Sequence, residues 1–265
     1  MTQAARPDFA RTISANGQAG TIDLTAADDA FPVCSGQAVP WWAVVSSGLA
    51  PVLLVGAWLA ADAVQPASYS PIRQTISALA GYAGTDRWIM TGALFLVGGC
   101  YIVTAVGLAS VRAAARILLI VSGLSTIGIA ASPEPASGPT SQHLAWTVLA
   151  AITIAIWPAF AARRPPARPL ILGPCSSAAV TAVFAVLLGW LLIEAQGGAD
   201  VGLAERLTTA AQACWPFLVA VALRRTAHRA RRQELPGEQL AGSKPLPATT
   251  FRPASGGSRG PAEPR

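Results

Sequence analysis

Six long apolar runs divide the chain, and short polar connections separate them. A helix needs about 20 apolar residues to cross a hydrocarbon core of about 30 Å, and each run reaches roughly that length. The runs lack both the polar stripe of a soluble amphipathic helix and the strict alternation of a β-barrel strand. The pattern therefore predicts six transmembrane helices, at residues 41–61, 88–110, 113–131, 143–162, 170–193 and 203–223.

The sixth run is less apolar than the other five, because Glu205, Arg206 and Gln212 fall inside it. In an alternative with five membrane helices, this segment lies at the membrane interface. We favour six helices, since the run has the length that a span requires.

A shorter patterned segment lies between the first two runs, where residues 70–81 read SPIRQTISALAG. Ser70 is a typical N-cap, Pro71 suits the first position of a helix, and Gly81 is a common stop. A helix over residues 71–80 would be about 15 Å long, which is half of a bilayer core. We expect this helix to lie along the outer membrane boundary.

The composition agrees with a membrane protein. Of the 265 residues, 52% are hydrophobic and 12% are charged, whereas soluble domains carry about 25% charged residues. The four cysteines form no CxxC motif and only two histidines are present, so we predict no metal site and no cofactor. The predicted fold class is an all-α membrane protein, a six-transmembrane-helix bundle with a short interfacial helix after the first span.

Arginine is concentrated in every second connection and after the last span. Because Lys and Arg accumulate in short cytoplasmic loops, these connections are predicted to face the cytoplasm. Both termini are then cytoplasmic, and the protein is expected to be a multi-pass protein of a bacterial cell membrane. The arginines concerned are Arg112, Arg116, Arg163, Arg164, Arg168, Arg224, Arg225, Arg229, Arg231 and Arg232.

The two ends of the chain differ from the apolar region of residues 41–225, which we predict to be the transmembrane domain. Residues 1–40 and 226–265 show no sustained hydrophobic period and are predicted to be disordered cytoplasmic tails. The basic segment Arg224–Arg232 directly follows the last span. Its expected partner is therefore anionic lipid of the inner leaflet rather than nucleic acid.

Three features together resemble a known family. They are the SPIRQTISALAG segment, the Arg87–Trp88 pair that opens the second run, and His143 at the start of the fourth. Over residues 41–225 the chain resembles the bacterial membrane proteins of domain-of-unknown-function family 998. Members often carry an acidic residue directly after the serine of the segment, whereas this chain has Ala78. The resemblance implies a multi-pass bundle and no established activity.

Ionisable groups near membrane depth are costly, so each marks a candidate functional position. Arg73 and Ser77 lie one helical turn apart on the 71–80 segment, and His143 opens the fourth run at the same membrane level. Since pairing lowers the cost of such groups, we predict one outward-facing polar pocket between the fourth and sixth helices, roofed by residues 71–80. The predicted ligand-binding residues are Arg73, Ser77, His143, Glu205, Thr209 and Gln212.

Each of these residues also has a purely structural interpretation. His143 can cap the fourth helix at the wet interface, and Arg73 can extend to lipid headgroups or pair with Asp86. Thr209 and Gln212 can hold helices together by hydrogen bonds within the membrane.

The sequence leaves three functions open. The first is an integral membrane protein that binds a lipid or small molecule in the polar pocket. The second is a structural or regulatory membrane protein without a ligand. The third is a membrane-embedded hydrolase with Ser77 as nucleophile and His143 as base, for which no GxSxG motif is present. The residues favour a binding protein over an enzyme, and the structural alternative has equal support.

Overall fold

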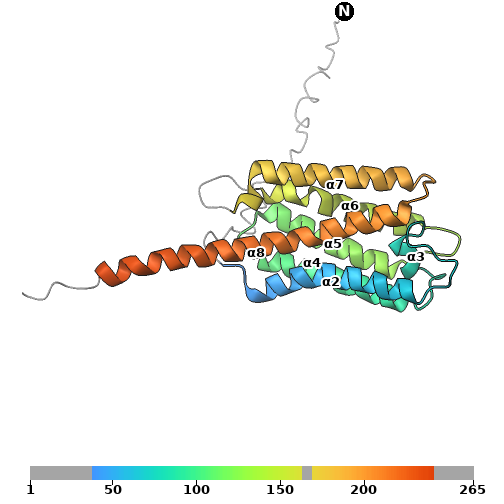
Figure 1. The fold of residues 1–265 in the computed structure, drawn as a ribbon, viewed down its shortest axis with the longest axis horizontal. Coiled ribbons are helices and arrows are strands. Elements are labelled where there is room, and N and C mark those ends of the chain that lie inside the picture. Colours follow the sequence, from blue (N-terminus) through green and yellow to red (C-terminus); the bar gives the residue numbers. More distant parts are fainter. Residues whose placement is uncertain (1–37, 163–168, 242–265) are drawn as a thin grey trace, which may run out of the picture. The chain divides into compact units, whose positions relative to one another are not determined.

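The computed structural model describes residues 38–162 and 169–241. This part of the chain is entirely helical (Figure 1). Its elements are α2 (Trp41–Ala63), α3 (Ile76–Ala80), α4 (Trp88–Gly107), α5 (Ala113–Ala131), α6 (Ser141–Ala161), the 3-10 helix η1 (Leu170–Leu172), α7 (Pro174–Glu194) and α8 (Val201–Ala241). The chain divides into two compact units, Met1–His228 and Arg229–Arg265, and the helix bundle belongs to the first.

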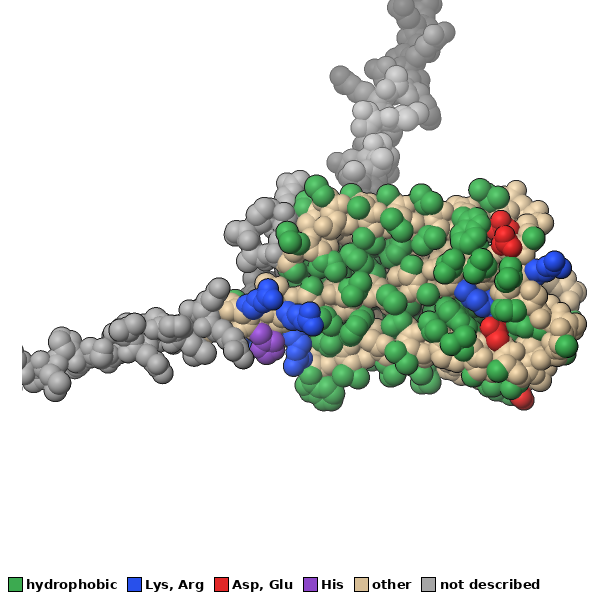
Figure 2. Space-filling view, in the orientation of Figure 1, with side chains coloured by type: hydrophobic (Ala, Val, Ile, Leu, Met, Phe, Trp, Pro, Cys, Tyr) green, Lys and Arg blue, Asp and Glu red, His purple; other side chains and the backbone are tan. Residues whose placement is uncertain are grey.

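Six of the helices are long and apolar enough to cross a membrane, which confirms the predicted six-helix bundle over the five-helix alternative. Each has at least 19 residues, and the last candidate span covers Val201–Arg231. Apolar side chains cover the middle of the visible face of the bundle, while charged side chains gather toward its two ends (Figure 2). This distribution is the one that a bilayer requires, because its core offers charged groups no water.

The last helix is longer than the sequence analysis predicts. We expected a span that ends at Leu223 and a disordered tail from residue 226, but α8 continues to Ala241. Alanine, arginine, glutamine and glutamate dominate residues 227–234, and all four favour helix. The helix therefore extends through residues 226–241, past the predicted end of the span. The predicted tails at 1–37 and 242–265 lie outside the described residues, as does the 163–168 part of the fourth connection.

The short helix after the first span is confirmed, but only its second half is helical. Residues 71–74 form turns, and α3 begins at Ile76 because Thr75, rather than Ser70, is the N-cap. The Thr75 side-chain oxygen accepts a hydrogen bond from the backbone N–H of Ala78 at 3.1 Å. Gly81 ends the helix as predicted.

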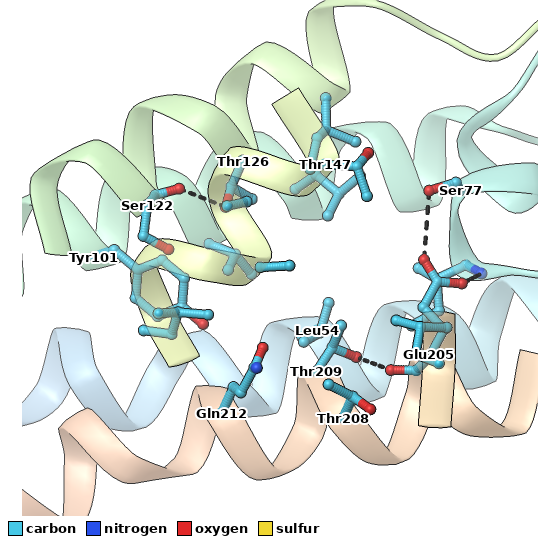
Figure 3. A pocket seen from close by; sticks show the side chains of 18 residues that line it. Leu54, Ser77, Tyr101, Ser122, Thr126, Thr147, Glu205, Thr208, Thr209 and Gln212 are labelled. Atoms are coloured by element: carbon cyan, nitrogen blue, oxygen red, sulfur yellow. Dashed lines mark hydrogen bonds between the residues drawn. The ribbon is translucent and has the colours of Figure 1, made fainter. Parts of the chain in front are cut away.

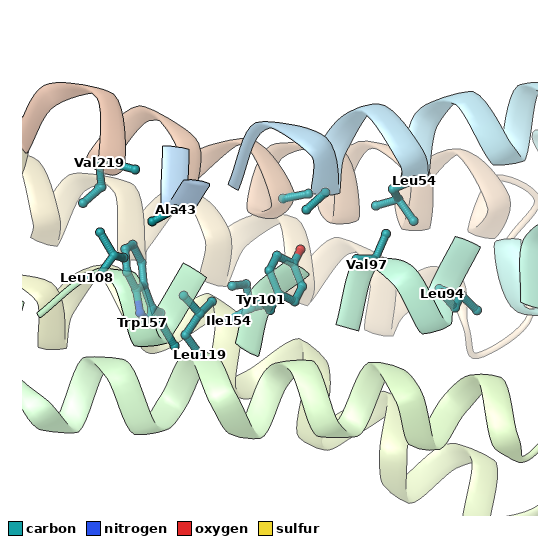
Figure 4. Close-up of a cluster of buried hydrophobic side chains, with 14 of the residues drawn as sticks. Ala43, Leu54, Leu94, Val97, Tyr101, Leu108, Leu119, Ile154, Trp157 and Val219 are labelled. Carbon is teal, nitrogen blue, oxygen red and sulfur yellow. The ribbon is translucent and has the colours of Figure 1, made fainter. Parts of the chain in front are cut away.

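One apolar core runs the length of the bundle. Away from α3, buried apolar side chains such as Trp157, Leu119 and Val219 form a continuous core (Figure 4). Here α4 and α5 approach so closely that a Cβ atom on Gly98 would lie 2.5 Å from the carbonyl oxygen of Gly123. Buried hydroxyl groups occur along the whole bundle, whereas the buried side chains of His143 and Arg206 lie at the end next to α3. We call this the α3 end of the bundle.

Candidate functional site

An ion pair joins α2 to α8 at the α3 end. Arg206 Nη2 lies 2.9 Å from Asp62 Oδ1, and the same nitrogen donates to the Tyr69 hydroxyl at 2.6 Å. The Tyr69 hydroxyl in turn donates to Asp62 Oδ1 at 2.7 Å. Burial and the hydrogen bond to Asp62 raise the pKa of Tyr69, so this hydroxyl stays protonated and closes a triangle of hydrogen bonds. Arg206 is only 8% exposed.

The other terminal nitrogen of Arg206 fixes the turn before α3. Nη1 donates to the carbonyl oxygens of Pro71 at 2.6 Å and Gln74 at 2.8 Å. The turn lies directly against α8, because a Cβ atom on Gly202 would come within 2.2 Å of the Gln74 oxygen. These contacts explain why residues 71–74 do not continue the helix of α3: their carbonyl groups bind an arginine.

Glu205 binds the same region from the neighbouring position of α8. Its carboxylate accepts hydrogen bonds from the backbone N–H of Ile76 and, at 3.4 Å, from the Ser77 hydroxyl. The acid therefore satisfies an N–H group at the start of α3 that has no partner within the helix. Glu205 and Arg206, adjacent in sequence, together hold the 71–77 segment over the end of the bundle.

A chamber of about 110 Å³ lies inside the bundle beneath Glu205. We call it the inner chamber. Gln212 on α8 is 3% exposed, and its side-chain nitrogen has no hydrogen-bond partner among the described residues. Figure 3 shows Gln212 and Thr209 on one side of the chamber and Ser122 and Thr126 on the other. Its polar lining consists of Ser77, Tyr101, Ser122, Thr126, Thr147, Glu205, Thr208, Thr209 and Gln212.

A larger cavity of about 430 Å³ adjoins the inner chamber and is lined mainly by α6 and α7. We call it the lateral cavity. Its walls are apolar and include Leu144, Val148, Ile152, Leu188, Leu191 and Leu192. Its polar residues lie at the α3 end and are Thr75, Ser77, Glu134, His143, Thr147, Glu194 and Glu205. Ser77, Thr147, Ala151, Leu191 and Glu205 line both spaces. The two spaces therefore meet beside Glu205.

His143 lines the lateral cavity but not the inner chamber. It is 3% exposed, and its Nδ1 atom lies 2.7 Å from the carbonyl oxygen of Ser132. Because a carbonyl oxygen only accepts, Nδ1 carries the proton. Ser77 donates to Glu205 instead of to this ring. The hydrogen bonds of Ser77 and His143 thus go to other groups, and they do not form the serine–histidine pair that hydrolysis requires.

Glu134 adds a third acid to the lateral cavity, beside Glu194 and Glu205, from the loop between α5 and α6. Burial raises the pKa of Glu134, and the nearby His143 partly opposes that rise. Among the described residues, no group of three or more His, Cys, Asp or Glu side chains lies together as metal ligands would.

The structure brings most of the predicted pocket residues together. Ser77 and Glu205 line both spaces, His143 lines the lateral cavity, and Thr209 and Gln212 line the inner chamber. Arg73 is the exception: its side chain is exposed and it lines neither space. The predicted convergence was therefore wrong for Arg73.

Sequence reasoning missed the arginine that does organise this end. In the sequence, Arg206 follows Glu205 near the start of the last predicted span, and Asp62 directly follows the first predicted span. These opposite charges at the ends of two spans could have predicted the ion pair, since charges near a membrane are usually paired. Tyr69 gave no such signal, because only the fold brings its hydroxyl to the ion pair.

Comparison with known families matches residues 49–222 to one described as "Protein of unknown function (DUF998)". The chain belongs to this family. The matched region of this DUF998 protein contains Asp62, Arg206 and both spaces, and it ends before the basic segment at Arg224. No curated protein and no solved structure matches the sequence.

Proposed function

We propose that this DUF998 protein binds a membrane lipid or another small amphiphile in the lateral cavity, with the α3 end facing outward from the cell membrane. The observation that carries the proposal is the division of the cavity into apolar walls on α6 and α7 and a polar group at the α3 end. An amphiphile likewise combines an apolar chain with a polar head group, so each part would meet a matching part of the cavity. The volume, about 430 Å³, falls within the range of about 300–1,000 Å³ that is usual for small-molecule sites.

The position of the apolar wall supports a ligand that comes from the bilayer. Leu144, Val148 and Ile152 on α6 and Leu192 on α7 line the cavity, and all four are also exposed on the bundle surface. α7 buries only Ser177 and Phe184. A hydrocarbon chain lying along these residues would remain in contact with lipid, so its transfer from the bilayer has little hydrophobic cost.

Charge supports the proposed orientation. Arg112, Arg116, Arg224 and Arg225 lie at the end of the bundle opposite α3. The end that is richer in arginine next to the spans is the cytoplasmic one in most membrane proteins. Both termini are then cytoplasmic, and the basic residues from Arg224 onward meet anionic lipid headgroups of the inner leaflet.

Mass spectrometry of the purified protein tests the proposal. The protein is extracted gently from membranes, and bound lipids are compared among the wild type, Ala151→Phe and Ala159→Phe. Ala151 lines both spaces, whereas Ala159 is an exposed residue further along the same helix. We expect the wild type and Ala159→Phe to retain a lipid or other amphiphile that Ala151→Phe loses.

Equal retention by all three proteins would overturn the proposed site. A wild-type protein that carries no amphiphile would favour the alternative of a structural or regulatory membrane protein.

A further inference from the structure

We infer that the ligand is a long-chain amine whose ammonium group binds beside Glu205 at the inner chamber, with its hydrocarbon chain in the lateral cavity. The inference rests on the proposed function and adds the chemistry of the head group. It is argued from the charges, the hydrogen-bonding capacity and the size of the two spaces.

The charges that line the two spaces are all of one sign. Glu134, Glu194 and Glu205 contribute carboxyl groups, and no lysine or arginine of the described residues lines either space. The nearest arginine of α8, Arg206, already binds Asp62 and two backbone carbonyl groups. A phosphate or carboxylate head group would therefore meet like charges without a cation to compensate them, whereas an ammonium group would be attracted.

Four threonine hydroxyl groups of the inner chamber already use their protons within the protein, so toward a ligand they can only accept hydrogen bonds. Thr126, Thr208 and Thr209 each donate to a backbone carbonyl group, at distances of 2.8, 3.2 and 2.8 Å. Thr147 does the same, to the carbonyl oxygen of His143 at 3.0 Å. Their remaining lone pairs need donors, and an ammonium group has up to three N–H donors.

Gln212 is the independent sign that a polar group belongs in the chamber. Its side-chain nitrogen is buried without a partner among the described residues, and the side chain lies across the chamber from Ser122 and Thr126 (Figure 3). A buried amide N–H group that lacks an acceptor is costly. A hydroxyl oxygen next to the ammonium group would meet this donor, so an amino alcohol fits the chamber better than a simple amine.

The size of the inner chamber limits the head group. Its volume of about 110 Å³ is somewhat below the roughly 150 Å³ of a cavity that holds benzene. A primary ammonium group with one neighbouring hydroxyl is small enough for a chamber of this size. The chain leaves past Glu205, where the inner chamber and the lateral cavity meet.

Photo-crosslinking tests the inference on the full-length protein in nanodiscs of neutral lipid. Three probes share a twelve-carbon chain with a diazirine group and differ only in ending in a primary amine, an alcohol or a carboxylate. Labelled residues are mapped by mass spectrometry. We expect the amine to label the α6 and α7 residues of the lateral cavity at least about tenfold more than the carboxylate, with the alcohol between them.

Two variants locate the charge. Glu205→Gln keeps an acceptor for the Ile76 N–H group but removes the negative charge, and it should lower labelling by the amine about tenfold while labelling by the alcohol stays the same. Asp200→Asn is the matched control, because Asp200 is an exposed acid of the same end that lines neither space. It should leave all three probes unaffected.

The labelling results distinguish a failure of the ammonium assignment from a failure of the proposed amphiphile binding. If alcohol or carboxylate labels the lateral cavity as strongly as the amine, the cavity binds amphiphiles but the ammonium assignment is wrong. If Glu205→Gln leaves amine labelling unchanged, Glu205 is not the partner and the assignment is wrong as well. If no probe labels α6 and α7, the proposed function fails too. The comparison of probes on the wild type decides the head group even if a variant does not fold.

Discussion

Arg206 Nη2 lies 2.9 Å from Asp62 Oδ1, and this is the single salt bridge within the described part of the chain. It connects the end of α2 to the start of α8 and leaves Nη1 of the same arginine for the carbonyl groups of the turn before α3. One side chain therefore fixes both the bundle and the segment that covers its end. Glu205, beside it, is then free of the ion pair and lines the two spaces.

Removal of Arg206 should destabilise the protein strongly. In Arg206→Met, Asp62 loses its cation and two backbone carbonyl groups lose their donor, so we expect a loss of about 3 kcal/mol. Arg73→Met is the matched control, because Arg73 is an exposed arginine of the same segment, and it should change stability by less than about 0.5 kcal/mol. Thermal unfolding in detergent measures both. Equal effects of the two variants would show that the ion pair does not organise this end.

The Asp62–Arg206 pair should also behave as a unit. Asp62→Asn and Arg206→Met each leave a charged partner without compensation, so the double variant should lose less stability than the sum of the two single losses. A thermal unfolding cycle of the four proteins gives this coupling. Additive losses would mean that the two side chains act independently in the membrane.

Gly202 should tolerate no side chain. A Cβ atom there would lie 2.2 Å from the Gln74 oxygen and 2.5 Å from the Pro71 oxygen, so Gly202→Ala must displace the turn and should cost about 1–3 kcal/mol. Gly99→Ala in α4 is the control, because no atom lies within 4 Å of its Cβ position. There alanine should be neutral or slightly stabilising. A fall in melting temperature confined to Gly202→Ala is the expected result.

Glu134 should make stability depend on pH. Burial raises the pKa of this carboxyl group above its ordinary value of 4.5, so the folded protein holds the proton more tightly than the unfolded chain does. The resulting stabilisation is complete below about pH 4.5 and is lost as pH rises through the folded pKa. Relative to Glu134→Gln, the wild type should therefore lose stability as pH rises above about 4.5.

Urea or thermal unfolding across that pH range measures the difference. A gap between wild type and Glu134→Gln that stays constant with pH would show that Glu134 is not shifted in the folded protein.

The membrane topology can be tested by labelling of intact cells. In a background without native cysteines, Ser137→Cys lies in the exposed loop between α5 and α6, and His228→Cys lies at an exposed position of α8 in the arginine-rich segment after Leu223. A membrane-impermeant thiol reagent should react with the cysteine at position 137 and not with that at position 228. The opposite pattern would place the α3 end in the cytoplasm.

Sequence reasoning predicted the six spans because hydrophobic length is a local property of the chain. It failed at residues 71–74, where turn geometry depends on the distant Arg206 side chain rather than on local helix signals. It placed the wrong arginine in the pocket for a related reason: Arg73 and Arg206 are both predicted to lie at the same membrane level as Glu205. Only the fold shows that one points outward and the other inward.

The pocket was predictable in part. Glu205, Thr209 and Gln212 follow helical spacing on α8, so their shared face could be read from the sequence. The lateral cavity could not, because it results from how α6 and α7 pack rather than from any residue pattern.

Structure determination of the wild-type protein in lipid nanodiscs tests the proposed binding site most directly. We predict elongated density along Val148 and Leu188 that continues to a compact feature beside Glu205. Density with that shape would place an amphiphile in the lateral cavity. A well-resolved map in which side chains close the space between α6 and α7, with no density beside Glu205, would contradict the proposed function.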